Sequence, residues 1–131
     1  MNKCSLGALS ELRISAHYVR QGWVMYYPCS HDTPVDIVGI KGPRVKRIQV
    51  KTAYACGEII RANIDHKKSA KYSPDVVDTL ACVYDNSFKG DRIWLIPMED
   101  IEGITTLNLG KLDGSPSKTR ADFSPDNYEV K

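Results

Sequence analysis

Residues 35–54 constrain the fold of this 131-residue chain more than any other segment. Two runs rich in Val and Ile are separated by a short turn cluster with Gly and Pro, which predicts a β-hairpin. A turn centred on that cluster sets Asp36 opposite Gln49, with Lys51 next along the same face. Opposed side chains lie about 5 Å apart at Cβ. A carboxylate, an amide carbonyl and an ammonium are therefore predicted to converge, and the two oxygens can share a metal ion.

The order of these residues resembles the PD-(D/E)XK nuclease superfamily, whose motif is an Asp on one strand and an acidic residue, any residue and Lys on the next. Asp36 and the segment Gln49-Val50-Lys51 stand at the motif positions. Glu11, in a predicted helix, matches the acidic residue that many members carry there. Within the superfamily the chain looks most like small phage- and intron-associated homing endonucleases, over about residues 5–110.

The resemblance implies an α/β fold with a restriction-endonuclease-like core, in which an N-terminal helix packs on a central mixed β-sheet with a catalytic hairpin. It also implies metal-dependent hydrolysis of phosphodiester bonds in DNA. Asp36, Glu11, the side-chain carbonyl of Gln49 and the backbone carbonyl of Val50 would hold Mg²⁺, for which Mn²⁺ would substitute. Lys51 would orient the attacking water and stabilise the developing charge. The predicted catalytic residues are Glu11, Asp36, Gln49 and Lys51.

Gln49 departs from the superfamily pattern, which usually has Asp or Glu at this position. An amide carbonyl can bind a hard cation but contributes no charge, so a weaker affinity for Mg²⁺ is expected. Certain homing endonucleases of this type also carry Gln here, which favours that branch. Three alternatives stay open: a Holliday-junction resolvase, a catalytically inactive DNA-binding relative, and a structural hairpin in which Asp36 and Lys51 form an ion pair.

The net charge of the chain is +2, which is too small to indicate a nucleic-acid-binding protein by itself. Contacts with DNA must therefore come from local clusters of basic residues. Such clusters lie on the hairpin, on the next predicted strand and in a basic loop after it. The candidate DNA-binding residues are Arg44, Lys46, Arg47, Arg61, Lys67, Lys68 and Lys71.

The four cysteines form no CxxC pair, and no secretory signal or long apolar run is visible. These features favour a reduced, cytoplasmic protein that has no membrane segment, and the family resemblance implies a phage or bacterial type. One chain offers one site, whereas a duplex has two strands to cut. A homo-oligomer that is at least a dimer and acts on double-stranded DNA is therefore predicted, and the resemblance to homing endonucleases adds a tetramer as the alternative.

An amphipathic helix is predicted over residues 5–21, because apolar residues recur there at spacings of three and four. The residues of this stripe are Leu9, Leu12, Ala16 and Val19. Glu11 lies on the flank of the stripe. We expect the side chains of this stripe to be buried and the side chain of Glu11 to point across the edge of the sheet toward the hairpin.

Further strands are predicted from short runs of β-branched and aromatic residues bounded by turn residues. They span residues 23–27, 57–64, 79–84, 92–96 and 104–109. The chain shows no internal repeat or linker, so residues 1–131 are expected to form a single nuclease domain. Residues 110–131 are polar and are expected to pack loosely.

Overall fold

The computed structural model describes residues 2–30, 32–64, 73–86, 90–119 and 123–131. A five-stranded sheet has the order β1-β2-β3-β6-β7. Its strands are β1 (Val24–Tyr26), β2 (Ile37–Lys41), β3 (Arg44–Thr52), β6 (Thr79–Tyr84) and β7 (Arg92–Pro97). Strands β3 and β6 are parallel and the other pairs are antiparallel, so the sheet is mixed as predicted.

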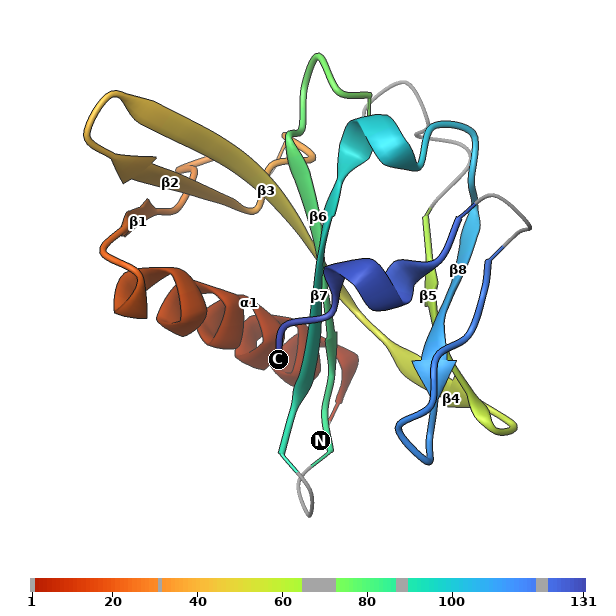
Figure 1. Cartoon of the computed structure of the whole chain (residues 1–131). Helices are drawn as coiled ribbons and strands as arrows, with labels where there is room; N and C mark the ends of the chain where they lie inside the picture. The colour runs from red at the N-terminus through yellow and green to blue at the C-terminus, as the bar shows by residue number, and fades with distance from the viewer. Residues whose placement is uncertain (1, 31, 65–72, 87–89, 120–122) are drawn as a thin grey trace.

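Helix α1 (Lys3–Arg20) lies against one face of this sheet and contacts β1, β2, β3 and β6 (Figure 1). The α/β fold with an N-terminal helix on a mixed sheet is therefore confirmed. The side chain of Asn2 caps the helix by accepting a hydrogen bond from the Ser5 N–H at 2.9 Å. Gly22 follows the helix with a φ of 91°, the left-handed conformation that glycine adopts readily.

The predicted buried face of α1 is wrong. The residues that α1 buries are Ser10, Ile14 and Tyr18, whereas Leu12 is 59% exposed and Val19 is 56% exposed. On this side the helix packs Ile14 and Tyr18 into the core, and the Ser10 hydroxyl lies 2.8 Å from that of Thr52 on β3. A pattern of apolar residues alone does not register such a contact.

The register of the β2–β3 hairpin is the predicted one. Ile37 pairs with Ile48 and Lys41 pairs with Arg44. Continued by one residue, this register sets Asp36 across from Gln49. Gly42 turns the chain with a φ of 59°.

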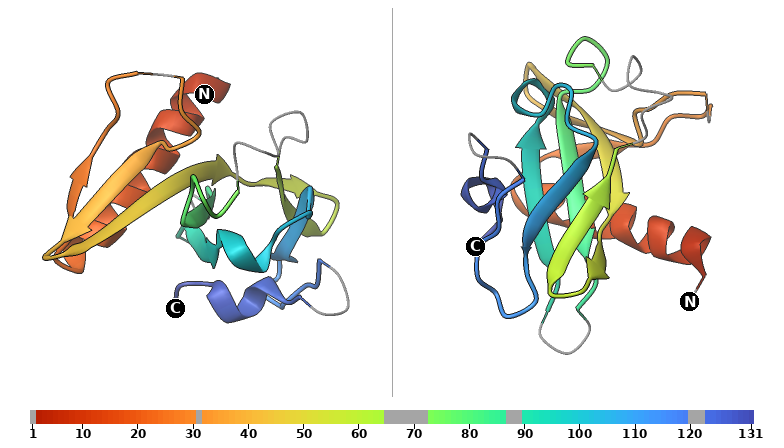
Figure 2. Two further views of the ribbon diagram at one scale, coloured as in Figure 1. Left: turned by 90° about the horizontal axis from the view of Figure 1, so that it is seen from above. Right: turned by 90° about the vertical axis from the view of Figure 1, so that its right-hand side faces the viewer.

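A second sheet of three strands has the order β4-β5-β8 and was not predicted. It contains β4 (Tyr54–Cys56), β5 (Ile59–Asn63) and β8 (Thr106–Lys111). The returning strand of the hairpin breaks at Ala53, whose N–H donates to the Val83 carbonyl at 2.8 Å. The chain then continues as β4, so that β3 and β4 lead from one sheet to the other (Figure 2, left). The other predicted strands are present, with ends shifted by a few residues.

The core has two parts. One lies between α1 and the five-stranded sheet and includes Ile14, Ile48 and Val83. The other lies between the two sheets and includes Trp94 and Leu107, both fully buried. The hairpin strand β3 thus separates two apolar layers, and its polar side chains reach the surface near its ends.

Residues 123–131 are docked, which corrects the expectation of loose packing for this part of residues 110–131. A short 3₁₀ helix, η3 (Pro125–Tyr128), lies over β7 and β8, and a second one, η2 (Met98–Asp100), follows β7 (Figure 1). Val130 N–H donates to the Ile93 carbonyl at 2.8 Å, and Arg92 binds the carboxylate of Glu129. The aromatic rings of Phe123 and Tyr128 stack. In the described part of the chain, no helix has the length and apolar character needed to cross a membrane.

Candidate functional site

The start of β2 places the carboxylate of Asp36 against β3. The Asp36 N–H donates to the Ile48 carbonyl at 2.8 Å. Its Oδ2 atom accepts a hydrogen bond from the Val50 N–H, also at 2.8 Å. The regular pairing of β2 with β3 ends at Ile37 and Ile48. The Asp36 side-chain oxygen therefore accepts the hydrogen bond from the next inward-facing backbone N–H of β3, that of Val50. The carboxylate is thereby fixed beside the segment Gln49-Val50-Lys51.

Glu11 and Asp36 line the same cavity, which has a volume of about 250 Å³. We call it the carboxylate cavity. It lies between α1, the loop after β1 and the start of β2. Its lining residues are Glu11, Tyr27, Pro28, Ser30, Thr33, Val35 and Asp36. The predicted approach of the helix glutamate to the hairpin aspartate is therefore present in the structure.

Both carboxylates of this cavity are disfavoured as anions. Burial raises the pKa of Asp36, although the Val50 hydrogen bond and the charge of Lys51 act in the opposite direction. Burial also raises the pKa of Glu11, and the negative charge of Asp36 raises it further. Two partly buried carboxylates that repel each other are a typical feature of sites that bind cations or transfer protons.

Lys51 supplies the positive charge that faces Asp36. It lies on β3 next to Cys82 of β6 in the parallel register, and its charge lowers the pKa of the Asp36 carboxyl. Burial raises the pKa of Cys82 to about 12, so that thiol stays neutral. The carboxylate and the ammonium thus lie within electrostatic reach of each other, as the hairpin register predicts.

Gln49 is 7% exposed and contains a buried acceptor that lacks a hydrogen-bond partner among the described residues. That atom is Oε1, while Nε2 makes one long contact of 3.4 Å with the Val50 carbonyl. A buried carbonyl without a partner is energetically unfavourable, typically by about 1–3 kcal/mol. A bound cation is one way to satisfy it.

The available ligands fit a hard cation that prefers oxygen. Asp36 and Glu11 provide carboxylates, and Gln49 and Val50 provide carbonyls. Within the described ranges, no group of three or more His, Cys, Asp or Glu side chains could hold a metal ion. Any metal bound in this region would therefore use the carbonyl oxygens as well as the two carboxylates.

The hairpin residues predicted to contact DNA fall into two groups. Arg47 is held by Asp78, with Nε–Oδ2 and Nη2–Oδ1 distances of 3.0 Å, and it also donates to the carbonyls of Pro74 and Asp75. This arrangement fixes the turn before β6 to β3 and argues against a phosphate contact by Arg47. Arg44 and Lys46 lie instead over aromatic rings on the α1 side of the sheet.

The remaining candidates for DNA contact lie away from the hairpin. Arg61 is on β5 and donates from Nε to Asn108 Oδ1 at 2.8 Å. Lys67, Lys68 and Lys71 lie outside the described residues.

Sequence reasoning missed the small polar side chains of the cavity wall and the partner of Arg47. Ser30 and Thr33 belong to the loop after β1, whose Pro, Ser and Thr content indicated only a loop. Asp78 had no visible partner in the sequence, because Arg47 lies far away along the chain. The only hint in the sequence was the position of Asp78, an acidic residue directly before the buried run of β6.

Comparison with known proteins assigns this chain to a class of nucleases. The sequence profile of the PD-(D/E)XK endonuclease family matches residues 1–111, so the chain belongs to this family. The chain is 25% identical over 109 residues to protein 5.3 of Escherichia phage T7. The aligned region covers 80% of this chain and 88% of that protein. In structure it is similar to the bacterial homing endonuclease I-Ssp6803I, with a TM-score of 0.75 and 12% identity. That match covers 98% of this chain and 86% of the other.

Proposed function

We propose that this nuclease is a metal-dependent endodeoxyribonuclease that cuts double-stranded DNA at specific sites, with residues 1–131 acting as one domain. The observation that carries the proposal is the carboxylate cavity. Burial raises the pKa of both Asp36 and Glu11, and the unpartnered oxygen of Gln49 lies on the adjoining strand. Such a group of oxygens is expected to bind a divalent cation. The site-specific part of the proposal draws on the similarity in fold to a homing endonuclease.

Asp36, Glu11, the Gln49 side chain and the Val50 carbonyl would hold the cation, which we propose to be Mg²⁺ with Mn²⁺ as a substitute. When bound, such an ion lowers the pKa of a bound water and polarises the phosphate. The Val50 N–H keeps the Asp36 carboxylate in one orientation. Because Gln49 contributes no charge, we expect a lower affinity for the ion than a third carboxylate would give.

Lys51 and Glu11 have different proposed roles. The ammonium of Lys51 is close enough to Asp36 to affect its titration, so it would lie beside the scissile phosphate. There it would stabilise the negative charge that develops in the transition state. Glu11 lines the carboxylate cavity from α1 and would orient the attacking water or a second ion.

Cutting both strands of a duplex requires two active sites, so we propose that the chain acts as a homo-oligomer, either a dimer or a tetramer. The outer side of α1 exposes Leu12 and Val19, which lie two turns apart on one side of the helix. Sedimentation equilibrium at micromolar concentration tests this idea. A monomer both with and without DNA would overturn it.

The main test is cleavage of long duplex DNAs and of a four-way junction, with Mg²⁺ or with EDTA. Wild type and Asp36→Ala are compared on each substrate. We expect discrete cuts in duplex DNA that need Mg²⁺ and are lost in the variant. Preferential cutting of the junction would instead identify a Holliday-junction resolvase. Equal DNA binding by both proteins with no cutting of any substrate would identify an inactive DNA-binding relative.

A further inference from the structure

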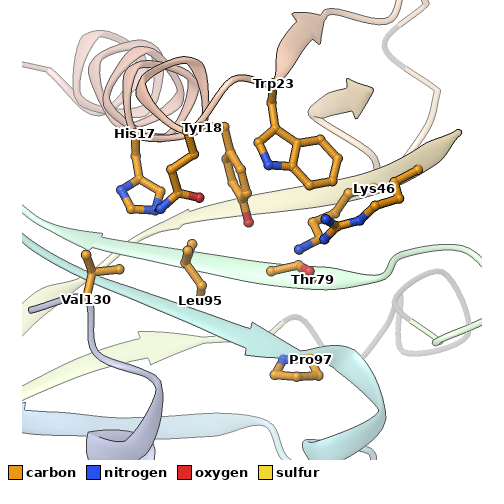
Figure 3. A pocket seen from close by; sticks show the side chains of 10 residues that line it. His17, Tyr18, Trp23, Lys46, Thr79, Leu95, Pro97 and Val130 are labelled. Carbon is orange, nitrogen blue, oxygen red and sulfur yellow. The ribbon is translucent and has the colours of Figure 1, made fainter. Parts of the chain in front are cut away.

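A second pocket lies where α1 ends, and it shares no lining residue with the carboxylate cavity. We call it the cationic pocket. Its volume is about 330 Å³, which is within the range of small-molecule sites. It is lined by His17, Tyr18, Gln21, Trp23, Arg44, Lys46, Thr79, Leu95, Pro97 and Val130 (Figure 3). None of these ten residues is acidic.

The positive charge of this pocket comes from Arg44 and Lys46 on β3. The Arg44 guanidinium lies 5.0 Å from the ring centroid of Trp23, and the Lys46 ammonium lies 5.3 Å from it. Lys46 is also 5.6 Å from the ring of Tyr18. In the part of the chain that the structure describes, neither cation has a carboxylate within ion-pair distance. Asp78 is the nearby acid, and Arg47 holds it in an ion pair.

Tyr18 provides an independent indication of a ligand. The residue is 2% exposed, and its hydroxyl has no hydrogen-bond partner among the described residues. Figure 3 shows this hydroxyl directed from α1 toward the sheet, between His17 on one side and Trp23 with Lys46 on the other. Burial raises the pKa of Tyr18 to about 12, so the group stays a neutral hydroxyl that can donate a hydrogen bond.

The other polar groups of the pocket are compatible with an anion. Burial, followed by the charge of Arg20, lowers the pKa of His17, so its ring is neutral near pH 7. Thr79 adds a hydroxyl from the start of β6. An ammonium, a guanidinium and two hydroxyls around one space match the several acceptor oxygens of a phosphate group. Trp23 and Tyr18 are only 6% and 2% exposed, so the phosphate is the part of a nucleotide that the pocket would hold.

We propose that the cationic pocket binds a phosphate group, carried either by a free nucleotide or by a nucleic-acid backbone. This site is separate from the proposed catalytic centre and lies on the α1 side of the sheet. The positively charged side chains of β3 would then have two roles. Arg47 fixes the turn before β6 to β3, whereas Arg44 and Lys46 would bind the phosphate.

The test is an NMR titration in EDTA, which monitors the indole N–H of Trp23 and does not depend on cleavage. The probes are inorganic phosphate, deoxyadenosine 5′-monophosphate, deoxyadenosine and a short DNA duplex. We expect a saturable shift with the monophosphate and none with the nucleoside. A shift with the duplex as well would identify the DNA backbone as a source of the phosphate. A shift with the monophosphate alone would identify a free nucleotide.

Three variants make the test specific. Lys46→Gln should weaken binding of the phosphate probe about tenfold or more, because a charged donor is lost. Lys111→Gln is the matched control, since it removes an exposed lysine on β8 and should leave the affinity unchanged. Tyr18→Phe should weaken binding about fivefold. It should also leave the free protein at least as stable as wild type, because it removes a buried hydroxyl that has no partner.

Two results would overturn the proposal. One is the lack of a saturable shift with any phosphate-bearing probe in a protein whose spectrum is that of a folded chain. The other is an equal loss of affinity in Lys46→Gln and Lys111→Gln, which would mean that only the net charge matters. Because the proposed cleavage is not used as a readout, its failure would leave this result unaffected.

Discussion

Helix α1 borders two partly buried charged sites of opposite sign. The carboxylate cavity contains Glu11 and Asp36, and burial raises the pKa of both. The cationic pocket contains Lys46, and burial, together with the charge of Arg44, lowers its pKa. In each site the environment disfavours the charged form. A ligand of the opposite charge would relieve this in each site, and we propose a metal cation for the first site and a phosphate for the second.

Arg47, which lies beside Lys46 on β3, is an example of a charged residue with a purely structural role. The Asp78 carboxylate raises the pKa of Arg47, and Arg47 in turn lowers the pKa of Asp78. Each charged group is thus stabilised by a partner within the protein. The contrast with Glu11, Asp36 and Lys46 separates a charge that holds the fold together from charges that we propose to bind a ligand.

The largest expected effect is that of Asp36→Asn on cleavage. The amide retains an oxygen for the Val50 N–H but removes the charge that would hold the cation, so the rate should fall by about 10³-fold or more. The metal-free variant should be as stable as wild type or more stable, by up to about 1 kcal/mol, because a disfavoured buried charge is gone. Single-turnover cleavage and thermal unfolding in EDTA measure the two quantities.

The control for this variant is binding of duplex DNA, which should stay near the wild-type affinity. A variant that cuts DNA at the wild-type rate would contradict the role of the carboxylate cavity. A variant that unfolds more easily in EDTA would show that Asp36 is a structural charge, as Arg47 is.

Arg47→Ala and Lys46→Ala should differ in stability. Loss of Arg47 leaves Asp78 without its partner and removes hydrogen bonds to the turn before β6, which should lower the free energy of unfolding by about 1–2 kcal/mol. Loss of Lys46 relieves repulsion from Arg44 but removes its contacts with the rings of Tyr18 and Trp23, so the stability should change little. Urea unfolding of both variants measures the difference. Equal destabilisation would contradict the distinction between structural and ligand-binding charges.

Much of the site could be predicted from the sequence, because it depends on local geometry. The turn fixed the hairpin register, and the register placed Asp36 by Gln49 and Lys51. The cationic pocket could not be predicted in this way. It brings together Tyr18, Lys46 and residues of β6 and β7, and this depends on which side of α1 faces the sheet. The sequence pattern favoured the side of Leu12, whereas the hydroxyl contact of Ser10 belongs to the buried side.

The second sheet was missed for a related reason. The alternating run through residue 54 reads as one continuous strand, and nothing in it marks the break at Ala53. That break depends on a hydrogen bond to Val83, which lies on β6. The docking of the C-terminal segment likewise depends on Glu129 meeting Arg92 from a distant strand. Long-range contacts of this kind leave no periodic signal in the sequence.

Gln49→Glu tests whether the unpartnered oxygen of Gln49 belongs to the cation site. A third carboxylate should raise the affinity for Mg²⁺ or Mn²⁺ by about tenfold, because the charge of the ligand set increases. In EDTA the same variant should unfold at a lower temperature, since three carboxylates then repel one another. Calorimetric titration with metal and thermal unfolding without it give the two values. Gln49→Met is the control, which removes the oxygen, adds no charge and should weaken metal binding.

The smallest effect expected is a change in the titration of Glu11. Burial and the charge of Asp36 both raise its pKa, so Asp36→Asn should move the pKa of Glu11 down toward the ordinary value. The folded protein with a raised carboxyl pKa binds protons more tightly than the unfolded chain. Its free energy of unfolding without metal therefore falls as the pH rises through the window between the ordinary and the raised pKa. In Asp36→Asn that pH dependence should be weaker, while metal binding by wild type should strengthen with pH over the same window. Carboxyl ¹³C NMR titrations of both proteins measure the shift, and an unchanged Glu11 titration would mean that the two carboxylates do not share one site.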